Sequence, residues 1–397
     1  MRNLKRKWCS DMTFLIVGCG ITGAVIARQL AERGEQVMIW DRRDHIGGNM
    51  FDETDGHGFL VQKYGPHTFH TNKKELYDYI CRFERWQEFR LTCGAVWDGE
   101  FTPTPFNFTT IDTFYPPERA AALKEKLKIA FAGRETAAVV EVMEHPDPDI
   151  RAYAEYLFEK DYAPYTAKQW GLDPGEIDAS VLKRVPLRFS YQDGYFDDRY
   201  QVMPEHSYTQ FFQNLLDHDN IQVCLGVDAL THLSIQDSRI YLDGMPLSVP
   251  VVYTGALDEL FGCVYGRLPY RSLRFEWRYE ERDSLQVTPI VAYPQEPGYT
   301  RITEYKKLPL QSGHGTSYAI EYPLPYQHGE KQEPYYPVLT ADSQAQYAKY
   351  RALAEQVTDL IFCGRLADFK YYNMDQALER AKKKKKMIEV RMRDHAF

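Results

Sequence analysis

Residues 14–23 read FLIVGCGITG, a short apolar and β-branched run that ends in three glycines with the spacing G-x-G-x-x-G. The next residues, 24–30, read AVIARQL and have helical character. Gly18 allows a tight turn, Gly20 lets the backbone approach a pyrophosphate, and Gly23 lets helix and strand pack closely. The start of the helix would offer free N–H groups and partial positive charge to phosphates. The stretch therefore predicts the strand, turn and helix that begin a dinucleotide-binding domain.

A second strand and an acidic residue follow at the spacing that such a domain requires. Residues 36–40 read QVMIW and end at Asp41, whose carboxylate is placed to bond a ribose hydroxyl. Residues 46–49 read IGGN, and a second glycine pair so soon after the acid is unusual for a plain NAD domain. It suggests extra backbone around a longer cofactor, as in FAD proteins of the glutathione-reductase type. The alternative, a glycine-rich turn without a ligand, does not account for the flanking strand, helix and acid.

The composition is that of an ordinary globular protein and argues against several functional classes. The chain has 397 residues, enough for two or three domains, with 44% hydrophobic and 26% charged residues. Its net charge of -8 argues against a nucleic-acid partner, so an anionic ligand needs locally placed arginines. The seven cysteines form no CxxC pair, which indicates reduced thiols rather than a disulfide framework or a metal site. We expect a cytoplasmic protein without a bound metal.

Two basic segments near the ends of the chain have simple interpretations. Residues 1–7 precede an apolar run, as in a signal peptide, but that run is the nucleotide-binding strand itself, so we reject secretion. No other run is long and apolar enough to cross a membrane, and no membrane partner is expected. The lysine run Lys382–Lys386 is interpreted as the solvated end of a helix around Met374–Ala381.

The order of patterns along the chain predicts a discontinuous α/β architecture. Residues 271–337 alternate apolar and polar and contain eight of the 22 prolines, which favours an antiparallel sheet. Strand patterns of the first domain return at 221–224, 251–253 and 360–363. We expect a Rossmann-like FAD-binding domain of residues 12–85, 204–268 and 358–390, a helical insertion of residues 112–182, and an antiparallel-sheet substrate domain of residues 183–203 and 269–357 with 86–111.

Two polar and aromatic stretches are candidates for ligand contact but are not diagnostic alone. Residues 63–71 read KYGPHTFHT and combine a Gly-Pro turn with His67 and His70, and lone histidines are usually structural. Residues 162–171 read YAPYTAKQWG, where the rings are either core or a surface on which a planar base stacks. Composition and spacing leave both alternatives open.

Eight stretches, taken in order, give the chain a close resemblance to one family, the UDP-galactopyranose mutases. They run in family order over nearly the whole chain, so the resemblance is far more specific than a Rossmann motif. The stretches are 46–49 (IGGN), 64–71 (YGPHTFHT), 105–107 (PFN), 165–171 (YTAKQWG), 182–186 (LKRVP), 299–304 (YTRITE), 333–337 (EPYYP) and 363–366 (CGRL).

The resemblance implies an FAD enzyme that interconverts UDP-galactopyranose and UDP-galactofuranose without net redox change and supplies galactofuranose for cell-surface polysaccharide. In the family, N5 of the reduced flavin attacks the anomeric carbon and UDP departs. The sugar ring then opens as a flavin adduct and closes through another hydroxyl. The expected partners are UDP-galactose or UDP-galactofuranose and a reductant such as NAD(P)H. The protein is expected to form a homodimer and not to bind nucleic acid.

The resemblance also assigns roles to individual residues. Arg184, on a loop that closes over substrate, and Arg301 correspond to the pair that neutralises the departing diphosphate, and His67 lies against flavin and sugar. Without the family match, a surface ion pair would be an equal interpretation of the arginines. The substrate-binding positions are Tyr162, Tyr165 and Trp170, which match the uridine-stacking region, and Thr166, Tyr195, Arg271, Tyr322, Tyr371 and Asn373. The cofactor-binding positions are Gly18, Gly20, Ile21, Thr22, Gly23, Asp41, Arg42, Gly48, Asn49, His67, Arg365, Tyr372 and Met374.

Three departures from the family pattern leave the identity of the sugar open. The chain has Ala292 where the family usually carries an asparagine, Leu91 where an amide or imidazole is frequent, and Asn373 in place of an acid. Acetamido-galactose, fucose and arabinopyranose nucleotides are therefore related possibilities. The alternatives from other classes are a flavin amine oxidase-like oxidoreductase, which would need an electron acceptor, and a non-catalytic nucleotide-sugar-binding protein.

Overall fold

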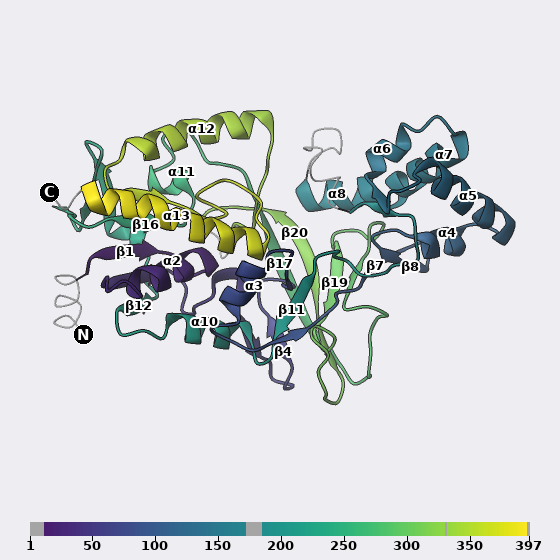
Figure 1. Cartoon of the computed structure of the whole chain (residues 1–397), viewed down its shortest axis with the longest axis horizontal. Helices are drawn as coiled ribbons and strands as arrows, with labels where there is room; N and C mark the ends of the chain where they lie inside the picture. The colour runs from purple at the N-terminus through teal and green to yellow at the C-terminus, as the bar shows by residue number, and fades with distance from the viewer. Residues whose placement is uncertain (1–11, 172–184, 330–331, 395–397) are drawn as a thin grey trace.

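The structure is a computed structural model that describes residues 12–171, 185–329 and 332–394, with side chains as far as Lys384. The molecule is elongated: a nucleotide-binding body and a group of helices lie on opposite sides of a central, mostly antiparallel sheet (Figure 1).

A five-stranded parallel sheet forms the centre of the nucleotide-binding body. Its strands are β1 (Phe14–Val17), β2 (Val37–Asp41), β12 (Ile221–Leu225), β16 (Val251–Tyr253) and β22 (Leu360–Phe362). They lie in the order β12-β2-β1-β16-β22, so β1 is the central strand and pairs with a neighbour on each side. The chain adds strands first on one side of β1 and later on the other. This reversal opens a crevice at the carboxyl ends of the strands.

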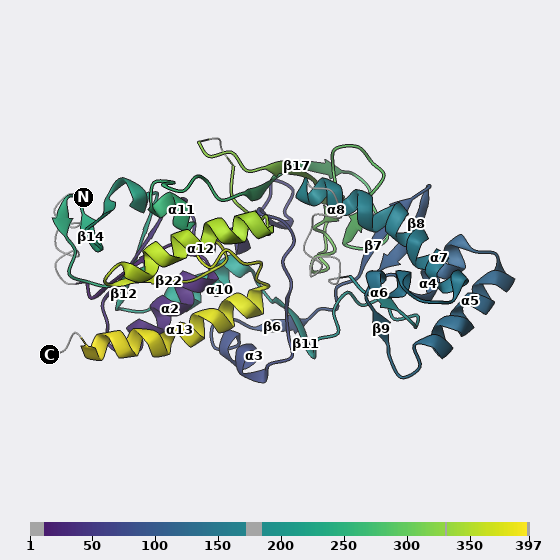
Figure 2. The same cartoon turned by 90° about the horizontal axis from the view of Figure 1, so that it is seen from above.

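Each face of the parallel sheet has its own covering layer. The elements are α2 (Ile21–Ala31), α10 (Tyr208–Leu216), η4 (Ala229–Thr231), β13 (Leu233–Gln236), β14 (Arg239–Leu242), β15 (Met245–Pro246), α11 (Leu257–Leu260), α12 (Ala341–Gln356) and α13 (Met374–Asp394). Phe14 and Ile16 pack in one buried cluster with residues of α2, α10 and α13. Leu15 points to the other face and packs with residues of α12, β13 and β14. Figures 1 and 2 show α13 lying along α2.

The central sheet has seven strands. They are β7 (Cys93–Trp97), β8 (Glu100–Thr104), β17 (Tyr270–Glu280), β18 (Ile290–Ala292), β19 (Arg301–Glu304), β20 (Thr316–Pro325) and β21 (Tyr336–Pro337). Their order is β21-β17-β20-β19-β18-β7-β8. All neighbouring strands are antiparallel except β18 and β7, which are parallel. β7 and β8 form a hairpin that comes earlier in the chain and extends the sheet beyond β18.

The helices beyond this sheet pack around a third buried cluster. They are α4 (Phe108–Phe114), α5 (Pro117–Ala130), α6 (Val139–Met143), α7 (Pro148–Leu157), the π-helical turn η2 (Phe158–Tyr162) and α8 (Ala163–Trp170). Asn107 begins α4 with a capping box, and the Asp147 side chain caps α7, which has Pro148 at its first position. Gly171, with φ of +65°, ends α8. The strands β9 (Thr136–Ala137) and β10 (Leu187–Arg188) close this region.

Smaller elements connect the nucleotide-binding body to the central sheet. They are η1 (Gly48–Met50), β3 (Asp52–Thr54), β4 (Leu60–Gln62), β5 (Phe69–Thr71), α3 (Lys74–Ile80), β6 (Trp86–Glu88) and β11 (Tyr200–Pro204). β5 pairs with β11, and His70 Nδ1 lies 2.7 Å from Asp198 Oδ2 just before β11. This contact ties β5, which follows the Gly65-Pro66-His67 turn, to the segment before β11.

The C-terminal helix is longer than predicted. α13 starts at Met374 and continues through the lysine run to Asp394. The interpretation of these lysines as a solvated helix end is wrong for Lys384, whose residue is only 5% exposed. Its ammonium lies 5.1 Å from the centroid of the Phe362 ring. A lysine can be buried in this way because its aliphatic stem packs on apolar surface and its charge faces a ring.

Candidate active site

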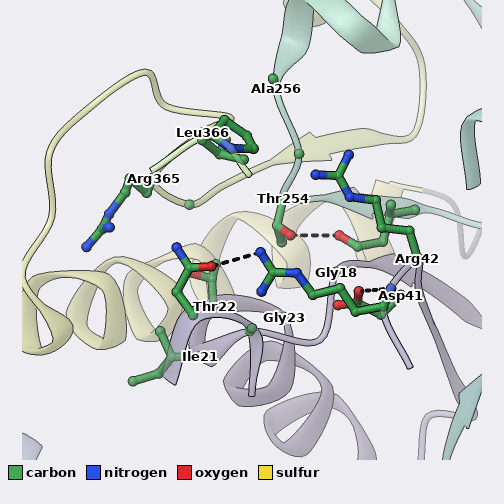
Figure 3. A pocket seen from close by; sticks show the side chains of 18 of the residues that line it. Gly18, Ile21, Thr22, Gly23, Asp41, Arg42, Thr254, Ala256, Arg365 and Leu366 are labelled. Atoms are coloured by element: carbon green, nitrogen blue, oxygen red, sulfur yellow. Dashed lines mark hydrogen bonds between the residues drawn. The ribbon is translucent and has the colours of Figure 1, made fainter. Parts of the chain in front are cut away.

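The carboxyl ends of the parallel strands open into one cavity of about 240 Å³, which we call the strand-end cavity. Gly18 follows β1, Asp41 ends β2 and Thr254 follows β16 (Figure 3). Gly364 lies just after β22 on the same cavity wall. The cavity wall includes every residue predicted to bind the cofactor: Gly18, Gly20, Ile21, Thr22, Gly23, Asp41, Arg42, Gly48, Asn49, His67, Arg365, Tyr372 and Met374.

The backbone of the glycine motif leaves no space for a side chain at Gly18. This residue has φ of +104°, and a Cβ there would lie 2.0 Å from Thr254 Oγ1, which donates to the Val17 carbonyl at 2.8 Å. A Cβ at Gly48 would lie 2.9 Å from the Gly20 Cα. Bare backbone from two turns therefore faces the start of α2, an arrangement that suits a pyrophosphate.

Asp41 holds the glycine turn in addition to facing the cavity. Its Oδ2 accepts the N–H of Cys19 at 2.6 Å, and its Oδ1 accepts the N–H of Arg43 at 2.9 Å. Each carboxylate oxygen has a further lone pair, so Asp41 retains the capacity to bond a ribose hydroxyl.

One carboxylate that sequence reasoning did not assign holds the two arginines after Asp41. Nη2 of Arg42 and Nη2 of Arg43 each lie 2.8 Å from Glu333 Oε2. Arg43 also donates to Asn49 Oδ1 and lies 4.3 Å from the centroid of the Tyr64 ring. Although burial opposes ionisation, the charges of Arg43 and Arg42 lower the pKa of Glu333. Glu333 begins the EPYYP stretch of the family pattern, but no local pattern in the sequence linked residue 333 to residues 42 and 43.

A second cavity of about 240 Å³, the central cavity, adjoins the first and extends to β18 and β19. The two cavities share Asn49, His67, Arg365, Asn373 and Met374. Because these residues come from three separate parts of the chain, the fold creates one junction where ligands in the two cavities would meet.

His67 stands at this junction as a neutral imidazole. Burial, together with the charges of Arg365 and Arg301, lowers the pKa of His67 to about 4, although its hydrogen bond with the Gly65 carbonyl opposes this. Nδ1 lies 2.8 Å from that carbonyl oxygen. Since a carbonyl only accepts, Nδ1 carries the proton and Nε2 is an acceptor.

Arg301 lies on β19 in the wall of the central cavity. Its Nη2 is 2.9 Å from Oε2 of Glu321, whose side chain is 2% exposed. Burial disfavours the charge, but Glu321, with smaller contributions from Tyr165 and Tyr336, raises the pKa of Arg301 well above its ordinary value. Nε of Arg301 and Oε1 of Glu321 are buried without a hydrogen-bond partner in the described part of the chain. Such atoms fit a site that a polar ligand completes.

Arg184, the other arginine predicted to bind the diphosphate, lies outside the described residues, which end at Gly171 and resume at Val185.

A third, smaller cavity of about 150 Å³, the α8 cavity, extends from Arg301 along α8. The ring of Tyr336 is stacked on that of Tyr371 at 5.3 Å and lies 6.1 Å from that of Trp170. The predicted substrate residues on this wall are Tyr162, Tyr165, Thr166, Trp170, Tyr195 and Tyr371. The aromatic rings near α8 are therefore both packed and cavity-lining, which suits a planar base.

Two cations hold the C-terminal end of α8 in place. Lys168 Nζ donates at 2.6, 2.7 and 2.9 Å to the carbonyls of Tyr293, Glu296 and Tyr299. From β17, Arg271 donates to the carbonyls of Gln169 at 3.0 Å and Lys168 at 3.2 Å. Arg271 does not line the strand-end, central or α8 cavity, and the contacts that the structure gives it are with α8. Its contact with substrate remains a prediction.

Tyr322 is also absent from the walls of these three cavities. Side chains alternate along β20, so Glu321 points to Arg301 while Tyr322 points to the opposite face. There the guanidinium of Arg274 lies 3.9 Å from the centroid of its ring, and its hydroxyl donates to Glu276 at 3.1 Å. The structure therefore turns the Tyr322 side chain away from Arg301, and its predicted contact with substrate remains a prediction.

All three departures from the family pattern lie on the wall of the central cavity. Leu91 and Ala292 are apolar there, and Asn373 lies at the junction with the strand-end cavity. Asp161, which sequence reasoning missed, lines the central and α8 cavities. No local pattern in the sequence marked it.

Within residues 12–171, 185–329 and 332–394, three or more His, Cys, Asp or Glu side chains nowhere gather in a way that would hold a metal ion. The helices of the same residues include none with the length and apolar character needed to cross a membrane.

Comparisons with known sequences match both parts of the fold. A family model for UDP-galactopyranose mutase matches residues 160–371, and one for NAD(P)-binding Rossmann-like domains matches residues 16–83. The chain is 36% identical over 372 residues to a dTDP-fucopyranose mutase of Escherichia coli, covering 92% of this chain and 96% of the relative. It is 32% identical over 372 residues to a UDP-galactopyranose mutase of Mycoplasma pneumoniae, covering 92% and 93%.

Solved structures share the fold. A crystal structure of reduced UDP-galactopyranose mutase matches with a TM-score of 0.71 at 15% identity, covering 96% of each chain. An oxidoreductase from Methanosarcina mazei matches with a TM-score of 0.56 at 11% identity, covering 94% of this chain and 100% of the other. These likenesses show the fold alone, and they confirm the predicted α/β class with a Rossmann-like domain. The sequence matches establish that the chain belongs to the UDP-galactopyranose mutase family, a family of isomerases.

Proposed function

We propose that this chain is a flavin-dependent mutase that interconverts UDP-galactopyranose and UDP-galactofuranose. The observation that carries the proposal is the junction of the strand-end and central cavities at His67, with Arg301 in the wall of the central cavity. A dinucleotide in the first cavity and a nucleotide sugar in the second would touch at this junction. The arrangement suits a reaction in which cofactor and sugar contact each other directly.

FAD is the cofactor that we propose for the strand-end cavity. The glycine turns and the start of α2 suit its pyrophosphate, and Asp41 suits its ribose. Arg365 offers a further cation, held by the Tyr372 carbonyl at 2.7 Å. Bound there in its reduced form, the flavin would supply an electron-rich nitrogen to the anomeric carbon and recover its electrons within the cycle.

Arg301 is the residue that we propose to hold the diphosphate of the substrate. Its charge is secured by Glu321, and the buried, unpartnered Nε leaves guanidinium capacity for a ligand. A guanidinium contacts two phosphate oxygens at once, which neutralises the charge that develops when the sugar bond breaks. We assign the same role to Arg184 from its position in the family pattern.

His67 would contact both ligands without adding charge. With its pKa at about 4, the imidazole is neutral at ordinary pH, and Nε2 can accept a proton or a hydrogen bond. A neutral group at this point does not compete with Arg301 for the diphosphate. We therefore propose that His67 positions the sugar against the cofactor.

The α8 cavity is the place that we propose for the nucleoside. Tyr165 and Trp170 offer rings on which a pyrimidine can stack, and Thr166 offers a hydroxyl to the ribose. The anchors at Lys168 and Arg271 keep this wall in position relative to Arg301.

UDP-galactose is the substrate that we propose first, and dTDP-fucose is the closest competitor. Relatives of similar identity are named for each of these sugars. Leu91 and Ala292 offer no hydrogen bond to a sugar hydroxyl, and each such bond is worth roughly 0.5–1.5 kcal/mol. We further propose from the family resemblance a homodimer in the cytoplasm, reduced by a donor such as NAD(P)H, that supplies galactofuranose for cell-surface polysaccharide.

A conversion assay tests this proposal. The protein is loaded with FAD, reduced with dithionite, and incubated separately with UDP-galactopyranose, UDP-N-acetylgalactosamine and dTDP-fucopyranose, and the nucleotide sugars are separated by chromatography. We expect furanose products, formed fastest from UDP-galactopyranose. A protein that binds no flavin, or that forms no furanose from any of the three, would contradict the mutase assignment. Faster conversion of another sugar would contradict only the choice of substrate.

A further inference from the structure

Asp161 lies where the central cavity meets the α8 cavity, and the proposed reaction has no use for it. It belongs to η2, directly before α8, and lines both cavities together with Tyr165. The residue is only 9% exposed. A carboxyl in such a position needs an explanation, because burying an ionisable group is costly unless it is paired.

The carboxyl of Asp161 has neither a hydrogen bond nor an ion pair with any described residue. The cation that acts on it, Lys168, directs its ammonium to three backbone carbonyls instead. Oε1 of Gln169, buried in the wall of the α8 cavity, is likewise without a partner in the described part of the chain. Two unpartnered polar groups on one helical segment, both at the cavity wall, indicate a polar ligand that completes them.

The carboxyl changes its protonation near neutral pH. Burial raises the pKa of Asp161 to about 7, and Lys168 opposes this only in part. It is therefore an acceptor above pH 7 and a donor below it. The titratable or charged side chains that share the wall of the α8 cavity with Asp161 are Tyr162, Tyr165, Tyr195, Arg301, Tyr336 and Tyr371. Those that share only the wall of the central cavity are Tyr64, His67, His70, Cys93, Tyr335 and Arg365, and the packed helix α7 adds Tyr153.

We infer that Asp161 selects the nucleobase by accepting a hydrogen bond from N3–H of a uracil or thymine ring that stacks on Tyr165. This inference rests on the proposed function, which puts a nucleotide sugar in these cavities. A carboxylate repels a diphosphate, so it must face a neutral donor of the nucleotide. Tyr165 follows Asp161 by four residues, so ring and carboxyl share one helix face. A base that lies on this ring turns its edge to the carboxyl.

The inference predicts an unusual dependence of base preference on pH. N3 of cytosine carries no hydrogen and is an acceptor. The ionised carboxyl therefore favours uracil and repels the cytosine lone pair, whereas the protonated carboxyl donates to it. The ratio of the dissociation constants of CDP and UDP should rise with pH through about 7. Both ligands carry the same ribose diphosphate, so its own titration cancels in the ratio.

Calorimetric titration of the FAD-loaded protein with UDP and with CDP, on both sides of pH 7, tests this prediction. We expect UDP to bind at least about tenfold more tightly than CDP above pH 7, with a smaller preference below it. In Asp161→Asn the ratio should be small and independent of pH, because an amide both donates and accepts. The matched control is Glu159→Gln, which removes an exposed acid of the same turn and should keep the wild-type curve.

The outcomes separate this inference from the proposal on which it rests. A wild-type ratio that does not change with pH would overturn the inference. Such a ratio is what a contact of Asp161 with the ribose hydroxyls would give, because both ligands share the ribose. The same dependence in Asp161→Asn would overturn it too. If neither nucleotide binds, the proposed function itself fails. The flavin spectrum reports whether the variant is folded, and if it is not, the wild-type ratio decides alone.

Discussion

Arg301 is a residue whose partners prepare it for an anion. Glu321 holds one guanidinium nitrogen, and Nε is buried without a partner in the described chain. Arg301→Lys keeps the charge but loses the planar fork that contacts two oxygens together. We expect kcat/KM for UDP-galactofuranose to fall at least about tenfold, a loss of about 1.4 kcal/mol of transition-state stabilisation. The flavin spectrum should not change, because Arg301 is not on the wall of the strand-end cavity.

Arg274→Lys is the matched control for this substitution. Arg274 is exposed on β17, lies against Tyr322, and is absent from the walls of the three described cavities, so its replacement should leave the kinetics unchanged. Near wild-type kinetics in Arg301→Lys would remove Arg301 from the diphosphate site.

His67 should remain neutral throughout the range in which ordinary histidines titrate. Its pKa is lowered from 6.5 to about 4, so its imidazole NMR signals should not shift as pH crosses 6.5. His206 is the internal control, because a hydrogen bond with Glu84 raises its pKa and its signals should titrate. The unfolded chain protonates His67 near pH 6.5 but the folded chain does not, so the free energy of unfolding should fall as pH drops from 6.5 to 4. His67→Asn should weaken that dependence, and a titration of His67 near 6.5 would refute the assignment.

Gly18 and Gly20 belong to one motif but should respond differently to substitution. A Cβ at Gly20 would lie 3.8 Å from the Gly48 Cα, an ordinary contact, whereas one at Gly18 would lie 2.0 Å from Thr254 Oγ1. Gly20→Val should therefore fold without binding FAD, and Gly18→Val should lose both stability and FAD. Flavin absorbance and thermal unfolding measure the two effects. Normal FAD content in Gly20→Val would show that the pyrophosphate lies elsewhere.

At the scale of elements, α8 depends on Lys168 for its position. Its ammonium bonds three carbonyls of the loop between β18 and β19, and burial, despite Glu296 and Asp161, lowers the pKa of Lys168 to about 8. Lys168→Met should raise KM at least about fivefold and change kcat less, because it displaces the nucleoside wall and not the junction. In the wild type KM should rise as pH passes 8. Lys160→Met is the control, because it removes a pair with Asp98 and a contact with the Tyr156 ring, neither of which lines the described cavities. Equal KM values for the two variants would contradict the role of Lys168.

Elements set by local patterns could be predicted from the sequence, and those set by distant partners could not. β1, α2 and β2 follow from the run of apolar residues, the glycine spacing and Asp41. The face on which Tyr322 lies depends instead on the register of β20, where it stands opposite Arg274 of β17. The burial of Lys384 in α13 against Phe362 of β22 is likewise a contact between distant elements, which no run of lysines reveals.

At the scale of the whole molecule, the site is assembled from segments far apart in the chain. Asn49, His67, Arg365 and Asn373 meet at one junction, and Glu333 bonds Arg43 from 290 positions away. Spacing predicted the strand-end cavity, because strand ends in such a sheet face one crevice. Among the residues of the central cavity, composition and spacing marked only the stretches 63–71 and 162–171 as candidates for ligand contact, and the family pattern supplied the other predicted residues. The role of Arg184 remains a prediction.

The measurement that tests the central claim most directly compares oxidised with dithionite-reduced protein on UDP-galactofuranose, with products separated by chromatography and the flavin spectrum recorded throughout. We predict UDP-galactopyranose as the product after reduction and almost none before it. Many turnovers should occur without an added acceptor, and the flavin should stay reduced. A flavin oxidoreductase would instead oxidise or reduce its flavin once per substrate and stop without an acceptor. Equal conversion by oxidised and reduced protein, or loss of reduced flavin in proportion to product, would contradict the account.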